Sequence, residues 1–538
     1  MEEQVHEKVF DRLQKCGIST SADVCSRLLD EIEGHFNNEI ISLIHGGKQF
    51  RFIGDNVNFT VGVKSERQDA KPQVCNWFAS CIITQTLSFS DLPDVSQGRT
   101  RDLNLSHFLP NADDERKLKN DYQVLISRVV KVFLPQLTFL YEGQPKHIIG
   151  QYSSNCKQKN VVMPTKVLPL NEQSYSDCVK ILGDYEDTLS DIFRQAGLDL
   201  DTARPIHIGG DQLTRERFSG AKSLKSGCFT ANERFDHLSP ITFELWHTAM
   251  NFLKLVFSKL YKISGSDKGT LEGERVLRHR DNVKEDVKNH YDQDKDFFLS
   301  FVKAYVVEAL CSFFGLNTKL DNPTKHVMPS DLPKSERKIW VRETMDEFLD
   351  NFVFAKHSDA SKSEVRETEE CTVVPLNVKL PGGTAITINS VQKKSVFIQE
   401  DAQHDRVKHY GHLVLELGLL FMQFLDVCKT PDRNRLLVTL KYMMVDFKTA
   451  NNHSKYALEI LRFLAHQQST LSLRRAHEVL HGLFVNTQGK IDSNIPADLQ
   501  MEHVVKRIKQ LLKNSSPNSK QESTHKKTPS PEWHGYHC

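Results

Sequence analysis

Three acidic residues stand in settings from which they could bind metal ions together. Asp55 follows the apolar run at residues 50–53, Asp211 follows the short stretch IHIGG at 206–210, and Glu502 lies near the start of an amphipathic segment at 499–513. Two strand-end aspartates and a helical glutamate could hold two Mg²⁺ or Mn²⁺ ions about 3.5 to 4 Å apart. Such a site activates a water molecule or a 3′-hydroxyl and stabilises the leaving oxygen in phosphodiester cleavage or strand transfer.

Each of the three residues also has a purely structural interpretation. Asp55 and Asn56 are residue types that favour turns, so they could form the turn of a hairpin. Asp211 could cap the helix that follows it. Glu502 lies one helical turn before Lys506, which is the spacing of a surface ion pair. The metal-site hypothesis therefore requires the three carboxylates to meet in space.

Two further residues are candidates for supporting roles. Asn56 adjoins Asp55 in the sequence. On a helix, Glu244, His247 and Asn251 would share one face, so His247 could approach the metal centre, and a Glu-x-x-His pair can itself bind a metal. The alternative is that His247 packs this helix against its neighbours.

Basic residues follow two of the three acids and are candidates for nucleic-acid contact. They are Arg215, Arg217 and Lys222 after Asp211, and Lys506, Arg507 and Lys509 after Glu502. If the carboxylates converge, both groups would flank one cleft and could bind the phosphates on either side of a scissile bond. The alternative is a solvated helix face, with the second group placed favourably at a helix C-terminus.

The elements that must position these residues indicate a mixed α+β fold, with short strands early and helices late. Residues 50–53 and the alternating run at 57–63 predict two strands paired as a hairpin, and 205–210 predict a short buried strand. Residues 72–142 are expected to be mostly helical, and Ser239-Pro240 has the form of a helix start, with the helix running to Lys262. Asp498 is expected to cap the helix that carries Glu502.

These patterns divide the chain into five segments. We expect an N-terminal helical segment at 1–48, the first part of a catalytic core at 49–262, an insertion with charged and loop-rich segments at 263–408, a helical part completing the core at 409–513, and a disordered tail at 514–538.

The bulk properties exclude several classes of protein. Lys plus Arg number 70 and Asp plus Glu 69, giving a net charge of +1, so any nucleic-acid site must be a local patch. The charged N-terminus predicts no secretory signal, and the two most apolar segments, near 301–316 and 412–428, are interrupted by charge, so buried helices and no membrane span are expected. The 11 cysteines include no CxxC pair, so no structural zinc is expected.

Five blocks of the sequence resemble a known family. FRFIGDNVNF, PIHIGGDQLT, HLSPITFELWH, HSKYA and NIPADLQMEH, in this order, are similar to a family of transposon-encoded proteins that is catalogued as a domain of unknown function. The resemblance covers about residues 10 to 513. It implies a ribonuclease H-like transposase core interrupted by a long, mostly helical insertion, with Asp55 and Asp211 in the aspartate blocks and Glu502 in the late acidic block.

The resemblance also implies a function. By analogy with DNA transposases, Asp55, Asp211 and Glu502 would form the metal triad of a nuclear or cytoplasmic enzyme that cleaves DNA and transfers strands with Mg²⁺ or Mn²⁺, and a homo-oligomer is compatible with it. Because hAT-like transposases carry a histidine after the second aspartate, His247 would assist.

One departure from the pattern keeps other functions open. Transposases commonly carry a separate N-terminal DNA-binding module, often zinc-based, and no zinc-ligand spacing precedes residue 50 here. The alternatives are a non-enzymatic nuclear scaffold derived from a transposase, which binds nucleic acid or protein, and an all-helical interaction protein. The all-helical alternative predicts that residues 50–63 and 205–210 are not neighbouring strands.

Overall fold

The computed structural model describes residues 38–61, 71–142, 144–261, 267–354, 365–379, 385–399, 406–450 and 454–514. The helices expected before residue 38, apart from a helix at 38–45, and most of the expected tail lie outside these ranges. The chain forms two compact units. The first unit contains residues 1–125, 145–297 and 420–538, and the second contains 126–144 and 298–419.

A five-stranded mixed sheet lies in the first unit. Its strands are β1 (Phe50–Val61), β2 (Gln73–Thr84), β3 (Val162–Pro164), β4 (Ile206–Gly210) and β5 (Leu238–Phe243), in the spatial order β3-β2-β1-β4-β5. β2 is antiparallel to β1 and β3, whereas β4 is parallel to β1 and β5 is parallel to β4. An early strand within 50–63 and the buried strand at 205–210 are therefore confirmed, and the all-helical alternative is wrong because β1 and β4 are neighbours.

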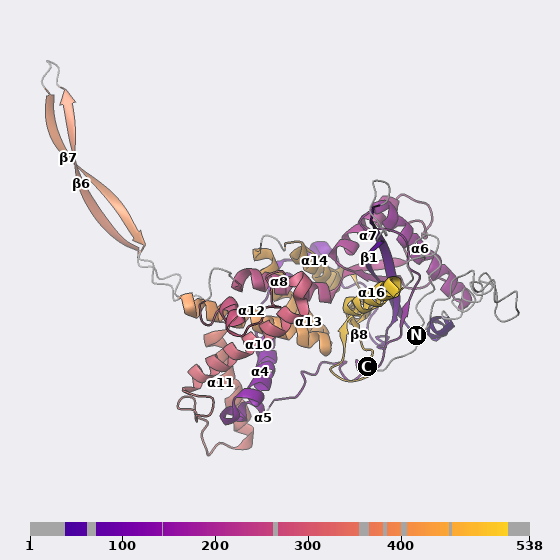
Figure 1. The fold of residues 1–538 in the computed structure, drawn as a ribbon, viewed down its shortest axis with the longest axis horizontal. Coiled ribbons are helices and arrows are strands. Elements are labelled where there is room, and N and C mark those ends of the chain that lie inside the picture. Colours follow the sequence, from indigo (N-terminus) through magenta and orange to yellow (C-terminus); the bar gives the residue numbers. More distant parts are fainter. Residues whose placement is uncertain are drawn as a thin grey trace. The chain divides into compact units, whose positions relative to one another are not determined.

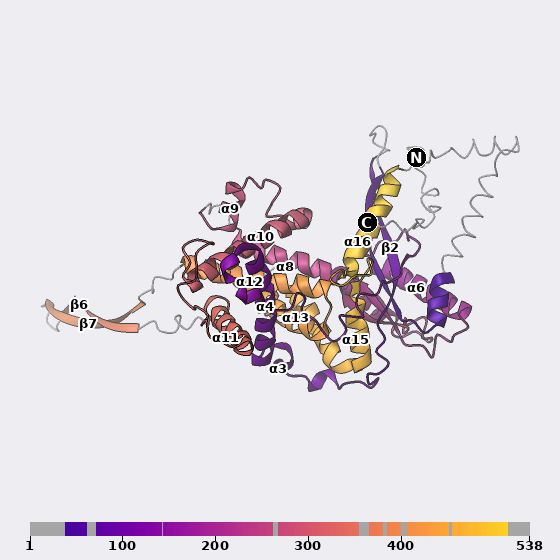
Figure 2. The same cartoon turned by 90° about the horizontal axis from the view of Figure 1, so that it is seen from below.

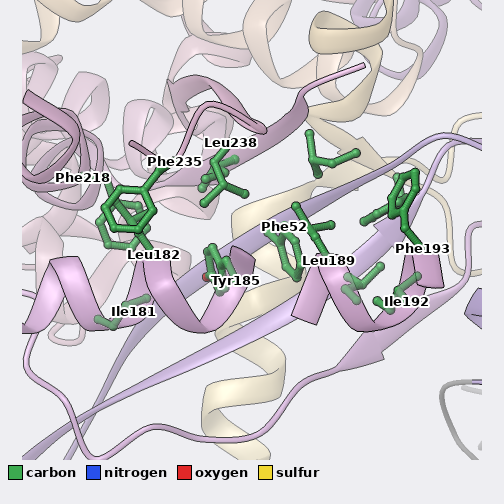
Figure 3. Close-up of a cluster of buried hydrophobic side chains, with 14 of the residues drawn as sticks. Phe52, Ile181, Leu182, Tyr185, Leu189, Ile192, Phe193, Phe218, Phe235 and Leu238 are labelled. Atoms are coloured by element: carbon green, nitrogen blue, oxygen red, sulfur yellow. The ribbon is translucent and has the colours of Figure 1, made fainter. Parts of the chain in front are cut away.

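Helices cover both faces of this sheet. One face packs against α6 (Tyr175–Gln195) and α7 (Gln212–Lys225), where Phe52 stacks on Tyr185 with ring centroids 4.4 Å apart (Figure 3). The other face packs against α16 (Ala497–Asn514), which lies along β1 and β2 (Figures 1 and 2). Side chains alternate along a strand. Because Ile53 and Val57 face α16, Asp55 also points to that side.

The predicted hairpin within residues 50–63 is wrong as far as these residues are described. β1 is a single strand through Asp55 and Asn56, and its antiparallel partner is β2. Gly54 serves close packing rather than a turn, because a Cβ there would lie 2.4 Å from the Phe78 ring and 2.8 Å from the Tyr185 hydroxyl. The turn interpretation of Asp55 is thereby excluded.

Two further helix predictions are wrong. Residues 73–84 form β2 rather than a helix, and Ser239-Pro240 lies inside β5 rather than at a helix start. β5 is an edge strand, where a proline costs no ladder hydrogen bond on its open side. The helix that follows is α8, which begins only at Leu245 and ends at Leu260.

The remaining elements are mostly helical, as expected for the C-terminal part. Those wholly in the first unit are η1 (Thr100–Asp102), α3 (Leu105–Phe108), α9 (Leu271–Leu277), α13 (Arg433–Thr449), α14 (Ser454–Ala465), the π-helix η4 (His466–Thr470), α15 (Leu473–Gly482), β8 (Phe484–Val485) and β9 (Ile495–Pro496). Those of the second unit are η2 (Pro135–Leu137), α5 (Phe139–Glu142), α11 (Lys334–Phe352), and the antiparallel pair β6 (Val365–Lys379) and β7 (Ala385–Gln399). α4 (Ala112–Phe133), α10 (Val287–Phe314) and α12 (Arg406–Lys429) contribute residues to both units.

Helices α10 and α12 contain the two most apolar segments of the sequence. By length and composition alone each could span a membrane, and 61% and 67% of the residues in their most apolar windows are buried within the structure. Core helices of globular proteins pass the same test.

Candidate functional site

Three separate elements bring Asp55, His247 and Glu502 together in the first unit. Asp55 comes from the middle of β1, His247 from the first turn of α8 and Glu502 from the second turn of α16. One ligand atom from each lies within 4.8 Å of the others, and His247 Nε2 is 3.8 Å from Glu502 Oε1. Glu502 therefore points toward Asp55 and His247. In the described part of the chain it does not make the ion pair with Lys506 that its surface interpretation would require.

Asp211 lies beside this cluster. It follows β4 as expected and is the N-cap of α7, with its Oδ1 accepting a hydrogen bond of 2.7 Å from the Thr214 backbone N–H. Its negative charge helps to raise the pKa of Asp55. Asp211 can cap α7 and still bind a metal ion, because the cap uses Oδ1 and leaves the other carboxylate oxygen for the ion.

Asp498 does not act as the expected cap of its own helix. Its two carboxylate oxygens accept hydrogen bonds of 2.9 Å from the backbone N–H groups of Trp246 and His247, at the start of α8. A third contact of 3.0 Å joins Asp498 Oδ2 to His247 Nδ1. Asp498 therefore ties the start of α8 to α16 and holds the imidazole so that Nε2 is the nitrogen nearer to Glu502.

The acids at this site repel one another. Burial, opposed by the charge of His247 and reinforced by Glu502 and Asp211, raises the pKa of Asp55 to about 7. Burial disfavours the charged imidazole of His247, but the hydrogen bond and charge of Asp498, with the charges of Asp55 and Asp211, raise its pKa to about 10. The cluster therefore has an excess of negative charge that either a protonated His247 or a bound cation would offset.

Glu172 is a further acid next to these residues. It lies in the loop before α6, is 1% exposed, and accepts hydrogen bonds from the Asn56 side-chain amide and the Thr214 hydroxyl. It thus links the strand residue next to Asp55 with the helix turn that Asp211 caps. Nothing in its local sequence, a polar loop, distinguishes it, because its partners are more than 40 positions away on either side.

Glu172 should make the stability of the protein depend on pH. Burial and the charge of Asp211 raise its folded-state pKa from the ordinary 4.5 to about 8. Between these two values the folded state binds more protons than the unfolded state, so this group makes the free energy of unfolding fall as pH rises from about 4.5 to about 8. In Glu172→Gln we expect that fall to be smaller by about 1 to 3 kcal/mol. Urea denaturation at pH 5 and pH 8 measures it, and an equal fall in wild type and variant would contradict it.

The other supporting residues have partners that differ from those expected. Glu244 does not share a site with His247, because its carboxylate forms a buried ion pair with Arg51. The Asn251 amide donates to the His247 carbonyl oxygen and to the Tyr456 hydroxyl, at 2.8 and 2.9 Å. Arg51 thus occupies the Glu244 carboxylate, and the cluster at His247 contains Asp55 and Glu502 instead.

The two groups of basic residues differ in their partners and in their exposure to solvent. After Asp211, Arg215 forms an ion pair of 3.0 Å with the buried Glu459, Arg217 lies over the Tyr175 ring and Lys222 donates to two backbone carbonyls. After Glu502, two of the three residues are exposed on α16 and one is partly exposed: Lys506, Arg507 and Lys509. The α16 group is thus the one whose charges are open to solvent.

Comparison with known proteins identifies a family but no function. Neither the search of curated proteins nor that of solved structures found a match. Residues 97–533 match the model of a family of unknown function, DUF6589. Since these residues make up most of the chain, the protein belongs to this family of unknown function.

Proposed function

We propose that the protein has a ribonuclease H-like core of transposon origin and is a transposase-like enzyme that cleaves DNA phosphodiesters and transfers strands. The observation that carries this proposal is that Asp55 on the central strand meets Glu502 on the helix packed against it. Asp211, after the adjacent parallel strand, is near enough for its charge to raise the pKa of Asp55. In the sheet order β3-β2-β1-β4-β5 only β2 is reversed, so the end of β4 that leads to Asp211 lies beside the central strand that carries Asp55.

The residues present fit divalent metal ions. Carboxylate oxygens are the donors that Mg²⁺ and Mn²⁺ prefer, and several of them face one another here without a cationic side chain other than His247 among the described residues of the cluster. Bound ions would lower the pKa of an attacking water and stabilise the leaving oxygen. Asp55, Asp211 and Glu502 would hold them.

The proposed reaction has two steps, and basic residues of the chain would position the DNA for both. In cleavage, a water molecule gives up a proton as its oxygen bonds to phosphorus, the bond from phosphorus to the 3′-oxygen breaks, and that oxygen takes up a proton. In strand transfer the released 3′-hydroxyl attacks a second phosphodiester in the same way. Lys506, Arg507 and Lys509 on α16 follow Glu502 along the helix and would bind flanking phosphates.

The long connection between α8 and α16 fits the same proposal. It includes α9 to α15 and part of the second unit, and it separates the elements carrying Asp211 and His247 from the one carrying Glu502. An insertion at this point leaves the sheet and α16 able to assemble one site. DNA as partner, a nuclear location and action as an oligomer follow from the proposal.

The test is metal-dependent cleavage of DNA. Purified full-length protein is mixed with supercoiled plasmid and Mn²⁺ or Mg²⁺, and calorimetry measures metal binding. We expect nicked and linear products with 3′-hydroxyl and 5′-phosphate ends, lost on addition of EDTA. A folded protein that binds no metal even with DNA present would overturn the proposal and favour a non-enzymatic scaffold, in which protonated His247 neutralises the acids.

A further inference from the structure

We propose that His247 is itself a metal ligand through Nε2, so that Asp55, His247 and Glu502 form a mixed nitrogen and oxygen site that prefers Mn²⁺ to Mg²⁺. This inference rests on the proposed function and deepens it. It names the nitrogen ligand of one metal site and says that this site prefers Mn²⁺. A site made of the acids alone would bind either Mg²⁺ or Mn²⁺.

The orientation of the ring is the first argument. Asp498 is 5% exposed at its side chain and is fixed by two backbone N–H groups of α8. It contacts Nδ1 of His247, and a carboxylate there places the ring proton on Nδ1 and leaves the Nε2 lone pair for a metal. The ring of Trp246 lies edge-on against the imidazole at 4.7 Å between centroids, which further restricts it.

The spacing of the donors is the second argument. Nε2 makes no hydrogen bond to another residue in the described part of the chain, and it lies 3.8 Å from Glu502 Oε1. With metal–ligand bonds of about 2.1 Å, an ion joins donors up to about 4.2 Å apart. All donor atoms of the cluster lie within 4.8 Å of one another, so small rotations of these side chains would bring the three donors around one ion.

The chemistry of the donors determines the choice of metal. Mg²⁺ demands near-ideal octahedral oxygen coordination and keeps its waters, whereas imidazole suits the transition-metal ions. Mn²⁺ accepts both carboxylate and imidazole. A proton on Nε2 must leave before an ion can bind there, so metal binding at this site would release it.

The experiment reads the ligand directly, without any activity. Mn²⁺ is bound to the full-length protein, and pulsed electron paramagnetic resonance tests for ¹⁴N coupling to the ion, with ¹⁵N-histidine labelling as proof of its source. We expect histidine coupling in wild type. We also expect it in the control His503→Gln, because His503 adjoins Glu502 but is exposed, and we expect its loss in His247→Gln.

Calorimetry on the same proteins gives a second readout. In His247→Gln the affinity for Mn²⁺ should fall at least about 10-fold, as for lost partners of a metal site, and the affinity for Mg²⁺ should fall less. Mn²⁺ bound without nitrogen coupling in wild type would overturn this inference and leave the proposed function standing. Absence of any Mn²⁺ binding would overturn both.

Discussion

The double variant Asp55→Asn, Asp211→Asn is expected to lose divalent-metal binding and DNA cleavage while keeping its fold. Each substitution removes a negative charge from the cluster that would hold the ions. The loss of metal affinity should exceed the roughly 10- to 100-fold that follows loss of a partner outside the first ligand shell. Calorimetry with Mn²⁺ and the plasmid assay measure the two effects.

The same double variant should lose metal binding without losing thermal stability. Burial and the charges of Glu502 and Asp211 raise the pKa of Asp55, so the ionised aspartate opposes folding at neutral pH and asparagine relieves that cost. Asparagine at position 211 can still cap α7. We therefore expect a Tm equal to or above that of wild type.

A matched control distinguishes the effect of losing the metal ligands from the effect of losing two negative charges anywhere on the protein. Asp191 and Asp281 are 62% and 92% exposed at their side chains, and the variant Asp191→Asn, Asp281→Asn has the same change in net charge. It should bind metal and cleave DNA as wild type does. Equal metal binding in the site variant and this control would place the ions elsewhere.

The sequence placed Asp211 after a strand and Glu502 in a helix, as the structure has them, but it placed Asp55 at a strand end rather than in the middle of β1. It also misjudged the elements around them. Residues 73–84 do not alternate, because β2 is a central strand with apolar neighbours on both faces: Phe78 and Ile82 on the α6 side, and Trp77 and Ile83 on the α16 side. A strand buried on both faces reads as a continuous apolar run, which is hard to distinguish from a buried helix.

Local residue preferences misled at two other places for physical reasons. Glycine next to Asp and Asn is typical of a turn, but Gly54 gives room for the side chains of Phe78 and Tyr185. Pro240 is typical of a first helical turn, but it also suits an edge strand. Both outcomes depend on contacts with residues distant in the sequence.

The same limit applies to the partners of the candidate site. Asp498 and Glu172 contact residues more than 200 and more than 40 positions away, respectively. A hydrophobic periodicity or a short motif carries information only about residues that are close together in the sequence. It could place His247 on a helix, but it could not place that helix end against Asp498.

Breaking the buried ion pair between Arg51 and Glu244 should cost more stability than any other single charge change considered for this protein. Both side chains are fully buried. Arg51 also donates a 2.7 Å hydrogen bond to the carbonyl oxygen of Gly482, so the pair joins β1, the N-cap of α8 and the end of α15. Arg51→Met would leave Glu244 buried without a partner, and we expect the free energy of unfolding to fall by about 3 to 5 kcal/mol.

The backbone around the pair is built for it. A Cβ at Gly209 would lie 1.5 Å from Arg51 Nη2 and 1.8 Å from Glu244 Oε1, so only glycine leaves room on β4 for both groups. Burial raises the pKa of Glu244, although the charge of Arg51 opposes the rise. Without Arg51 this pKa should rise further, so Arg51→Met should cost more stability above pH 8, where the unpaired carboxyl must ionise or hold a proton, than at pH 5.

Urea denaturation of four proteins tests this. In the double variant Arg51→Met, Glu244→Leu no buried charge remains, so its loss of stability should be smaller than the sum of the two single losses by at least about 1 kcal/mol. The exposed pair of Arg194 and Asp191 provides the control, and Arg194→Met should cost less than about 1 kcal/mol. If Arg51→Met costs no more than Arg194→Met, the buried pair does not hold the sheet to the start of α8. In that case the start of α8, and with it His247, must be held by its other contacts, among them those to Asp498.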